Sequence, residues 1–177
     1  MKDISAFSRA ELAALIVTTL ATAGIDVVLV GGACVCVYTN ERFGSFDLDF
    51  IDMSYARKKE IAAALDKIGF SPRGASKYFE RADCQWSIEF PSGPLAVGHE
   101  QIPSKRVAEL KTSMGNIRLL SPTDCIKDRL LWWYLETDGQ CWEQAVDIAR
   151  NHKVLWADLK TWHRRVRKPL KSATHST

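Results

Sequence analysis

Hydrophobic and polar positions follow two different patterns along the chain, and the change falls near residue 120. Before it, helical stripes alternate with short apolar or alternating segments, which predicts a mixture of helices and strands. Ser8 followed by Glu11 has the capping-box spacing and predicts the start of the first helix. From Ser121 and Pro122, which predict a helix start, apolar residues recur at helical intervals. The pattern therefore predicts an α+β (mixed α/β) core followed by helices.

Residues 27–52 form the centre of this prediction. They read as a buried strand VVLV, the pair Gly31-Gly32, a short helix, a polar loop and a second strand. The second strand contains FDLDF, in which Asp47 and Asp49 share one face while the apolar side chains share the other. We expect a unit that presents two carboxylates side by side near a glycine pair.

The rest of the chain supplies further elements and a division into parts. Ser54 is predicted to cap the helix that follows the second strand. Later strands are expected at 77–81 and 84–90, a hairpin at 107–112 and 116–120, and helices at 121–136, 141–151 and 154–165. The predicted parts are a core over 1–120, a helical subdomain over 121–165 packed on it, and a basic, disordered tail over 166–177.

Composition places few limits on function. The chain has 177 residues, of which 46% are hydrophobic and 25% charged, as in ordinary globular domains. A net charge of +3 is too small to indicate nucleic-acid binding by itself. We expect no secretory leader, because the first residues lack its charged and apolar segments, and no membrane span, because no apolar run is long enough to cross a bilayer. The five cysteines show no metal-ligand or framework spacing. These features predict a cytoplasmic protein that does not contact the membrane.

The aspartate pair carries the chemistry. Two carboxylates at i and i+2 on a strand lie close together, and like charges so placed resist joint ionisation. A divalent cation such as Mg²⁺ or Mn²⁺ removes that penalty, and its remaining positions accept water and phosphate oxygens. The alternative, that Asp47 and Asp49 lie on the solvated face of an edge strand, would be preferred for an isolated DxD. The preceding Gly31-Gly32, where backbone amides can approach a phosphate, favours the metal site.

These motifs resemble the polymerase-beta-like nucleotidyltransferase superfamily. The family pattern is an apolar strand ending in a glycine pair, then Asp-x-Asp, then a third acid on a later strand. Here VVLVGG, FDLDF and the glutamate of WSIEF match it. The resemblance implies Asp47, Asp49 and Glu89 as metal ligands and Gly31 and Gly32 at the phosphates of a nucleoside triphosphate (NTP). The chain departs from the pattern in having Glu89 where Asp is commoner, and in lacking a serine after the second glycine.

The helical part also has a resemblance. SPTDCIKDRLLWWY and EQAVDIA resemble small bacterial members of the minimal and AbiEii-type nucleotidyltransferases, some of which are associated with toxin–antitoxin or phage-defence loci. That resemblance implies Lys127 and Asp147 as further site residues. The alternatives are a solvated surface cation for Lys127 and a salt bridge on the helix surface for Asp147.

Two other features have both a functional and a structural interpretation. Arg42, in the loop before the aspartate strand, is a candidate for gripping phosphate, because guanidinium groups bind phosphate bidentately; a surface cation is the alternative. The consecutive aromatic residues Trp132, Trp133 and Tyr134 fan around a helix, and a core role is favoured over stacking on a nucleobase.

The sequence thus predicts a metal-dependent nucleotidyltransferase that moves a nucleoside monophosphate from an NTP to a hydroxyl or phosphate of an acceptor. The acceptor is left open between tRNA, a protein and a small molecule such as an aminoglycoside, and the oligomeric state is not determined. The alternative is a nucleotidyltransferase-fold protein with weak or no catalysis that acts as an antitoxin or protein-interaction module. The departures at Glu89 and after Gly32 give weight to that alternative.

Overall fold

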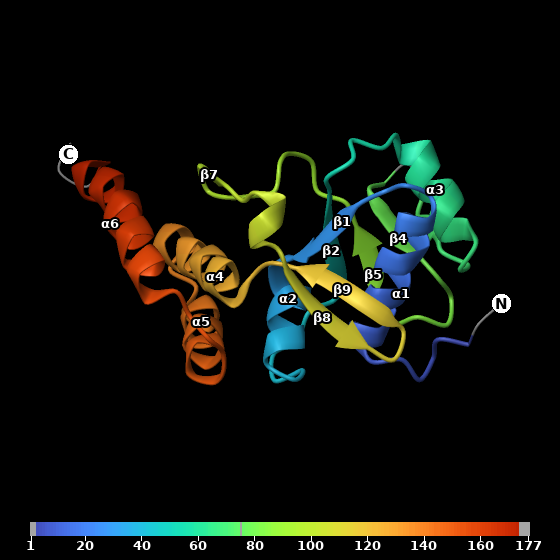
Figure 1. Cartoon of the computed structure of the whole chain (residues 1–177), viewed down its shortest axis with the longest axis horizontal. Helices are drawn as coiled ribbons and strands as arrows, with labels where there is room; N and C mark the ends of the chain where they lie inside the picture. Colours follow the sequence, from blue (N-terminus) through green and yellow to red (C-terminus); the bar gives the residue numbers. More distant parts are fainter. Residues whose placement is uncertain (1–2, 75, 174–177) are drawn as a thin grey trace.

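The computed structural model describes residues 3–74 and 76–173, and within them a sheet flanked by helices (Figure 1). The helices are α1 Arg9–Thr22, α2 Gly31–Tyr38, α3 Lys58–Asp66, α4 Pro122–Glu136, α5 Gly139–Asn151 and α6 Trp156–Ala173, with a 3₁₀ turn η1 at Ser104–Arg106. The strands are β1 Val27–Val30, β2 Asp47–Asp52, β3 Ser71–Pro72, β4 Tyr78–Glu80, β5 Ser87–Glu89, β6 Ala96–Val97, β7 Glu100–Gln101, β8 Ala108–Thr112 and β9 Gly115–Leu119. The predicted mixed fold with C-terminal helices is confirmed.

The strands that carry the predicted motifs lie in the middle of the sheet. Its seven strands have the order β3-β4-β5-β2-β1-β9-β8, and β6 and β7 form a separate pair. β1 runs antiparallel to β2 and parallel to β9, while β2 runs parallel to β5. The aspartate strand β2 therefore lies between the strand that leads to the glycine pair and the strand that carries Glu89.

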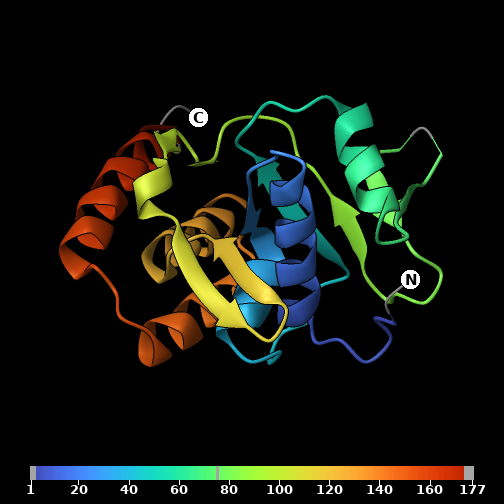
Figure 2. The ribbon, with the colours of Figure 1, turned by 45° about the vertical axis from the view of Figure 1, so that its right-hand side comes forward.

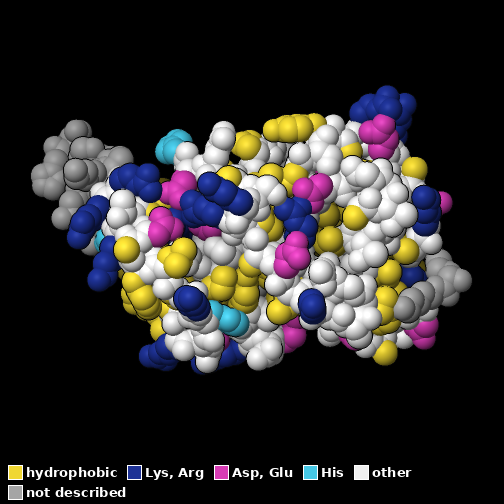
Figure 3. Space-filling model, in the orientation of Figure 1, with side chains coloured by type: hydrophobic (Ala, Val, Ile, Leu, Met, Phe, Trp, Pro, Cys, Tyr) yellow, Lys and Arg dark blue, Asp and Glu magenta, His cyan; other side chains and the backbone are white. Residues whose placement is uncertain are grey.

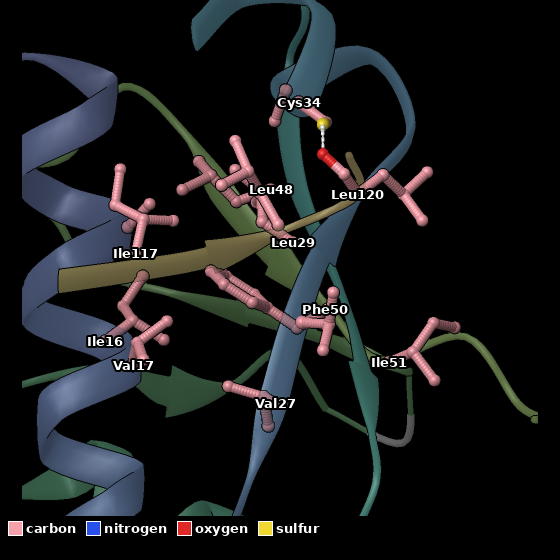
Figure 4. Close-up of a cluster of buried hydrophobic side chains, with 14 of the residues drawn as sticks. Ile16, Val17, Val27, Leu29, Cys34, Leu48, Phe50, Ile51, Ile117 and Leu120 are labelled. Carbon is pink, nitrogen blue, oxygen red and sulfur yellow. Dashed lines mark hydrogen bonds between the residues drawn. The ribbon is translucent and has the colours of Figure 1, made fainter. Parts of the chain in front are cut away.

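Alternation along β2 fixes which face carries the carboxylates. Leu48 and Phe50 are fully buried and point into a cluster with Leu29 on β1, Ile117 on β9 and Ile16 on α1 (Figure 4). Burial of each such side chain stabilises the fold by about 1.5–3 kcal/mol. A one-residue slip of β2 would expose this row and bury the aspartates, so the core holds the carboxylates on the opposite face.

Two of the helix starts predicted from the sequence are observed in the structure, and a third is not. Ser8 and Glu11 form the predicted capping box, and Ser121 caps α4 with Pro122 at its first turn. The prediction that Ser54 caps a helix is wrong, because α3 begins at Lys58. The Ser54 amide instead donates to Asp52 Oδ1 at 2.8 Å, and its Oγ accepts a hydrogen bond from the backbone amide of Asp26, just before β1. Ser54 therefore belongs to the turn that ends β2.

The C-terminal helices α4, α5 and α6 lie together beyond one end of the sheet, whereas α1 packs across a face of the sheet (Figures 1 and 2). α6 continues to Ala173, so helix extends into the segment that the sequence assigned to a basic tail from residue 166. The last four positions of that segment, 174–177, lie outside the described residues. Within the described part of the chain, none of the helices combines the length and the apolar character needed to cross a membrane.

Candidate active site

Three carboxylates meet on one face of the sheet. Asp47 and Asp49 project from β2, and Asp49 is the register partner of Glu89 on the parallel neighbour β5. Residues in register on adjacent strands point to the same face, which brings their side chains together. One carboxylate oxygen from each of the three residues lies within 4.8 Å of the others. The structure therefore brings together the two aspartates and the third acid that the sequence named.

The electrostatics of this triad (Asp47, Asp49 and Glu89) favour a bound cation. Burial, together with the negative charges of Asp47 and Glu89, raises the pKa of Asp49 to about 7. Glu89 itself is buried. A site built from oxygen donors with excess negative charge has the ligand chemistry that Mg²⁺ and Mn²⁺ prefer. The residues thus fit a divalent metal, and the cluster is consistent with a metal site.

Close packing explains the glycine pair, and Gly31 packs against this cluster. Gly31 opens α2 with φ +64°, and a Cβ atom there would lie 2.6 Å from Asp49 Oδ2. At Gly32, an added Cβ would lie 3.0 Å from Ser45 Oγ. Any larger side chain at Gly31 would push the Asp49 carboxylate from its place. Gly31 therefore lets the start of α2 approach Asp49 directly, and Gly32 lets it approach Ser45.

A cleft of about 390 Å³ opens beside the glycine pair, between the edge of the core and the helices α4 and α5. Its lining combines the glycines and Asp49 with apolar and charged groups from the C-terminal helices: Val30, Gly31, Gly32, Asp49, Ile51, Pro91, Leu95, Ala96, Leu120, Asp128, Arg129, Trp132, Asp138 and Cys141. A cleft that borders both a glycine-rich helix start and a carboxylate cluster has room and donors for a phosphorylated ligand.

Arg129 is a cleft residue that the sequence argument missed. Its side chain is largely buried, and its Nε donates to Asp128 Oδ2 at 3.1 Å. Burial alone would lower the pKa of Arg129, but Asp128 raises it above its usual value, so the guanidinium stays charged. The available signal was helical spacing, because Arg129 and Trp132 lie three residues apart on one face of α4.

The three consecutive aromatic residues of α4 divide between core and cleft. Trp133 packs against Trp142 with ring centroids 4.7 Å apart, and Tyr134 stacks on the buried Trp162. Trp132 lines the cleft and keeps 49% of its surface exposed. The core interpretation thus holds for two of the three, and Trp132 is half-exposed beside the cleft.

Lys127 is fully buried, but outside the lining of this cleft. Its Nζ donates to Glu100 Oε1 at 3.0 Å and to Asp158 Oδ2 at 2.8 Å, and lies 3.6 Å from Asp124 Oδ1. Arg106 joins the same group of acids. This ion-pair network ties α4 to α6 and to β7. On the face of the molecule drawn in Figure 3, basic and acidic side chains are intermingled over this part of the chain. The surface-cation alternative for Lys127 is therefore excluded by its burial.

Arg42 and Asp147 are placed against each other. The Arg42 guanidinium forms an ion pair with the Asp147 carboxylate, joining the loop before β2 to α5. Asp147 is buried, whereas 66% of the Arg42 side chain is exposed. Both border a smaller hollow of about 270 Å³ that Trp142 and Arg150 also line. Asp147 thus pairs with a distant loop residue rather than with a neighbour on its own helix.

Arg9 fixes the loop that leads into Asp47 at the start of β2. No sequence pattern indicated this role of Arg9. From the first turn of α1, its buried guanidinium donates to Ser45 O at 3.0 Å and to the Glu41 carboxylate at 3.1 Å. Ser45 Oγ in turn donates to the backbone carbonyl of Asp47 at 3.1 Å. The loop conformation includes Asn40 and Glu41 in the left-handed region, with φ of 51° and 62°.

Comparison with known proteins gives a clear result for the fold. No protein-family model matches the chain, and no curated protein matches it by sequence. Among solved structures, the antibiotic-resistance factor ANT(2'')-Ia in solution superposes with a TM-score of 0.59 at 13% identity, covering 91% of this chain and 92% of that one. The chain has the nucleotidyltransferase fold.

Two further structures support that assignment. The crystal structure of ANT(2'')-Ia in complex with adenylyl-2''-tobramycin has a TM-score of 0.57 at 12% identity, over 88% of this chain and 94% of that one. An antigenic nucleotidyltransferase-like protein from Paracoccidioides brasiliensis has a TM-score of 0.58 at 16% identity, over 93% and 91% respectively. At these identities the similarity establishes the fold, and the chemistry has to be argued from the site.

Proposed function

We propose that this protein is a divalent-metal-dependent nucleotidyltransferase that moves a nucleoside monophosphate from an NTP to an acceptor hydroxyl. The observation that carries the proposal is the meeting of Asp47, Asp49 and Glu89 within 4.8 Å, directly beside the glycine pair that opens onto the cleft. An edge strand with solvated acids would need neither a buried third carboxylate nor a glycine packed against Asp49.

Each residue of the site has a separate task in this proposal. Asp47, Asp49 and Glu89 would hold Mg²⁺ or Mn²⁺, which when bound neutralises charge on the transferred phosphoryl group and the leaving pyrophosphate. The amides of Gly31 and Gly32, at the start of α2, face the phosphates of the NTP. Catalysis by such a site consists mainly of positioning and charge stabilisation.

The α4 residues complete the nucleotide side of the cleft. We assign Arg129 to the phosphates, because a guanidinium held in a buried position can donate two parallel hydrogen bonds to phosphate oxygens. We assign Trp132 to the nucleobase, because its open face offers a stacking surface that tolerates any base. In this arrangement α4 supplies most of the nucleotide affinity, and β2 and β5 supply the reacting centre.

In the transfer itself, an acceptor oxygen attacks the α-phosphorus and the bond to pyrophosphate breaks. The proton of the acceptor hydroxyl passes to the carboxylate of Glu89, which we assign as the general base. Lys127, Arg42 and Asp147 act at a distance in this proposal. Lys127 fixes α4 against α6, and the pair of Arg42 and Asp147 fixes the loop before β2 against α5.

The similarity to ANT(2'')-Ia bound to adenylyl-2''-tobramycin makes ATP and a sugar hydroxyl the first donor and acceptor to test. The proposed test measures pyrophosphate release with each NTP and Mg²⁺ or Mn²⁺, and the mass gained by tobramycin, tRNA or protein acceptors. Asp47→Asn and Asp49→Asn should abolish release, whereas Asp66→Asn, on the exposed surface of α3, should not. Metal-dependent nucleotide binding that survives the double Asn variant would refute the assignment.

A second candidate function is an interaction module of the antitoxin type with weak or no catalysis. One observation favours it, namely that the third acid Glu89 is already ion-paired with Lys77. This candidate predicts that the protein binds NTP without releasing pyrophosphate with any acceptor or metal. Efficient turnover with a single acceptor would exclude it.

A further inference from the structure

A lysine is bound to the carboxylate triad. Lys77 directly precedes β4, and its ammonium group forms an ion pair with Glu89. The following residue, Tyr78, is the cross-strand partner of Glu89 and hydrogen-bonds to the same carboxylate. Asp49, Glu89 and Tyr78 thus form one row across three strands, and the Lys77 ammonium reaches the row from the end of β4.

No other cation in the described part of the chain forms an ion pair with these acids. The ion pairs of Arg9, Arg42 and Arg129 go to Glu41, Asp147 and Asp128. Lys77 therefore supplies the direct positive charge that the clustered carboxylates require in the absence of a metal.

The two partners differ in how freely they can move. Glu89 has 8% of its side chain exposed and is held by a strand on each side, whereas Lys77 has 61% exposed. A lysine ammonium is a compact charge on a flexible four-carbon stem, so it can leave the carboxylate for water without opening a cavity. The acid is fixed, and the ammonium is exchangeable.

We propose that Lys77 is the resident counter-ion of the metal-free site and competes with the divalent cation for Glu89. The inference rests on the proposed function, since it concerns the same triad. An ammonium at Glu89 weakens metal binding in the absence of nucleotide, because the incoming cation has to displace it. An NTP brings phosphate oxygens that also bind the metal, so metal and nucleotide enter together. The site is thereby kept from loading metal until a nucleotide is present.

The experiment is a titration with Mn²⁺ alone, in which free Mn²⁺ is measured by electron paramagnetic resonance. Lys77→Met should bind Mn²⁺ on the order of tenfold more tightly than wild type, because the cation no longer has to displace a charged hydrogen bond from Glu89. Lys77→Arg should keep the weak binding of wild type. The matched control is Lys111→Met, which removes an exposed lysine from β8 at the opposite edge of the same sheet.

With a nonhydrolysable ATP analogue present, the difference between Lys77→Met and wild type should shrink, because the nucleotide complex has already displaced the ammonium. Equal or weaker Mn²⁺ binding by Lys77→Met without nucleotide would overturn the role of Lys77. Thermal unfolding checks that Lys77→Met is folded. If Lys77→Met does not fold, Lys77→Gln takes its place in the titration.

The same titration separates this inference from the proposed function. If Asp47→Asn/Asp49→Asn loses Mn²⁺ binding while Lys77→Met matches wild type, the triad binds metal and Lys77 is not its counter-ion. If the double Asn variant binds as wild type does, or if no variant binds Mn²⁺, the metal site itself is wrong and both proposals fall.

Discussion

The Asp49 carboxylate lies so close to the backbone of Gly31 that a Cβ atom at Gly31 would stand 2.6 Å from Asp49 Oδ2. No side chain fits this gap without moving the carboxylate. The two motifs of the sequence, a glycine pair and Asp-x-Asp, are therefore one structural feature, in which the end of β1 and the middle of β2 meet.

This relationship predicts the effect of Gly31→Ala. The alanine would be strained at φ +64° and would displace Asp49, so both stability and Mn²⁺ affinity should fall. Gly24→Ala is the matched control, because Gly24 has a similar φ of +76° but no atom within 4 Å of an added Cβ. Each variant should lose about 1–2 kcal/mol in urea unfolding. Reduced Mn²⁺ affinity should appear in Gly31→Ala alone, and equal affinity in the two variants would contradict the steric argument.

The raised pKa of Asp49 predicts a pH-dependent stability. Its carboxyl titrates near 7 when folded and near 3.8 ordinarily, so the folded state binds the proton more tightly. Stability is then lost as pH rises through this window, from about 4 to about 7. Metal-free Asp49→Asn should therefore be more stable than wild type at pH 8, by about 1–2 kcal/mol after allowance for solvent screening, and no more stable at pH 4.

Urea unfolding with a chelator at both pH values measures this difference. Adding Mg²⁺ at pH 8 should stabilise the wild type and leave Asp49→Asn unchanged. A variant that is less stable than wild type at pH 8 would show that Asp49 is held by favourable contacts rather than crowded by like charges.

Arg129 should act on the nucleotide rather than on the metal. Arg129→Met should weaken binding of an ATP analogue by about 10–100-fold, which corresponds to loss of charged hydrogen bonds worth about 1.5–3 kcal/mol. Mn²⁺ affinity without nucleotide should change far less. The control is Arg73→Met, which removes an arginine that is ion-paired with Glu80 on the exposed sheet edge. Calorimetric titration with the analogue measures both, and equal affinities would remove Arg129 from the site.

Trp132 should report on the base. Trp132→Ala should lower affinity for an ATP analogue by about 1–3 kcal/mol, the usual value of one base–aromatic stack. Inorganic triphosphate, which has no base, should bind Trp132→Ala and wild type equally. Trp156→Ala is matched in exposure, at 53% against 49%, and lies outside the cleft lining, so it should bind as wild type does. Equal loss for triphosphate and the nucleotide analogue would contradict stacking.

Lys127 should matter for folding. Lys127→Met would leave Glu100, Asp124 and Asp158 without their central ammonium, and breaking such a buried pair costs about 3–5 kcal/mol. Urea unfolding should show that loss, and Lys160→Met, an exposed lysine on α6, should show none. A stable Lys127→Met with weakened nucleotide binding would instead support the role that the family resemblance implied for Lys127.

The sequence by itself determined the unit at the centre of the fold. VVLV, the glycine pair and FDLDF gave the strands, the helix start and the face that carries the aspartates, because strand alternation and glycine geometry are local properties. The family resemblance also pointed to Glu89, and its alternation with Ile88 and Phe90 predicted the face of the strand on which it lies.

Tertiary structure decided what surrounds those acids. Arg129 and Trp132 reach the cleft because α4 packs beyond the end of the sheet, and Lys77 reaches Glu89 because β4 pairs with β5. Lys127 and Asp147 found partners 31 and 105 residues away. Local periodicity fixes which residues share a face of a helix or strand, but the packing of elements distant in sequence decides what that face meets.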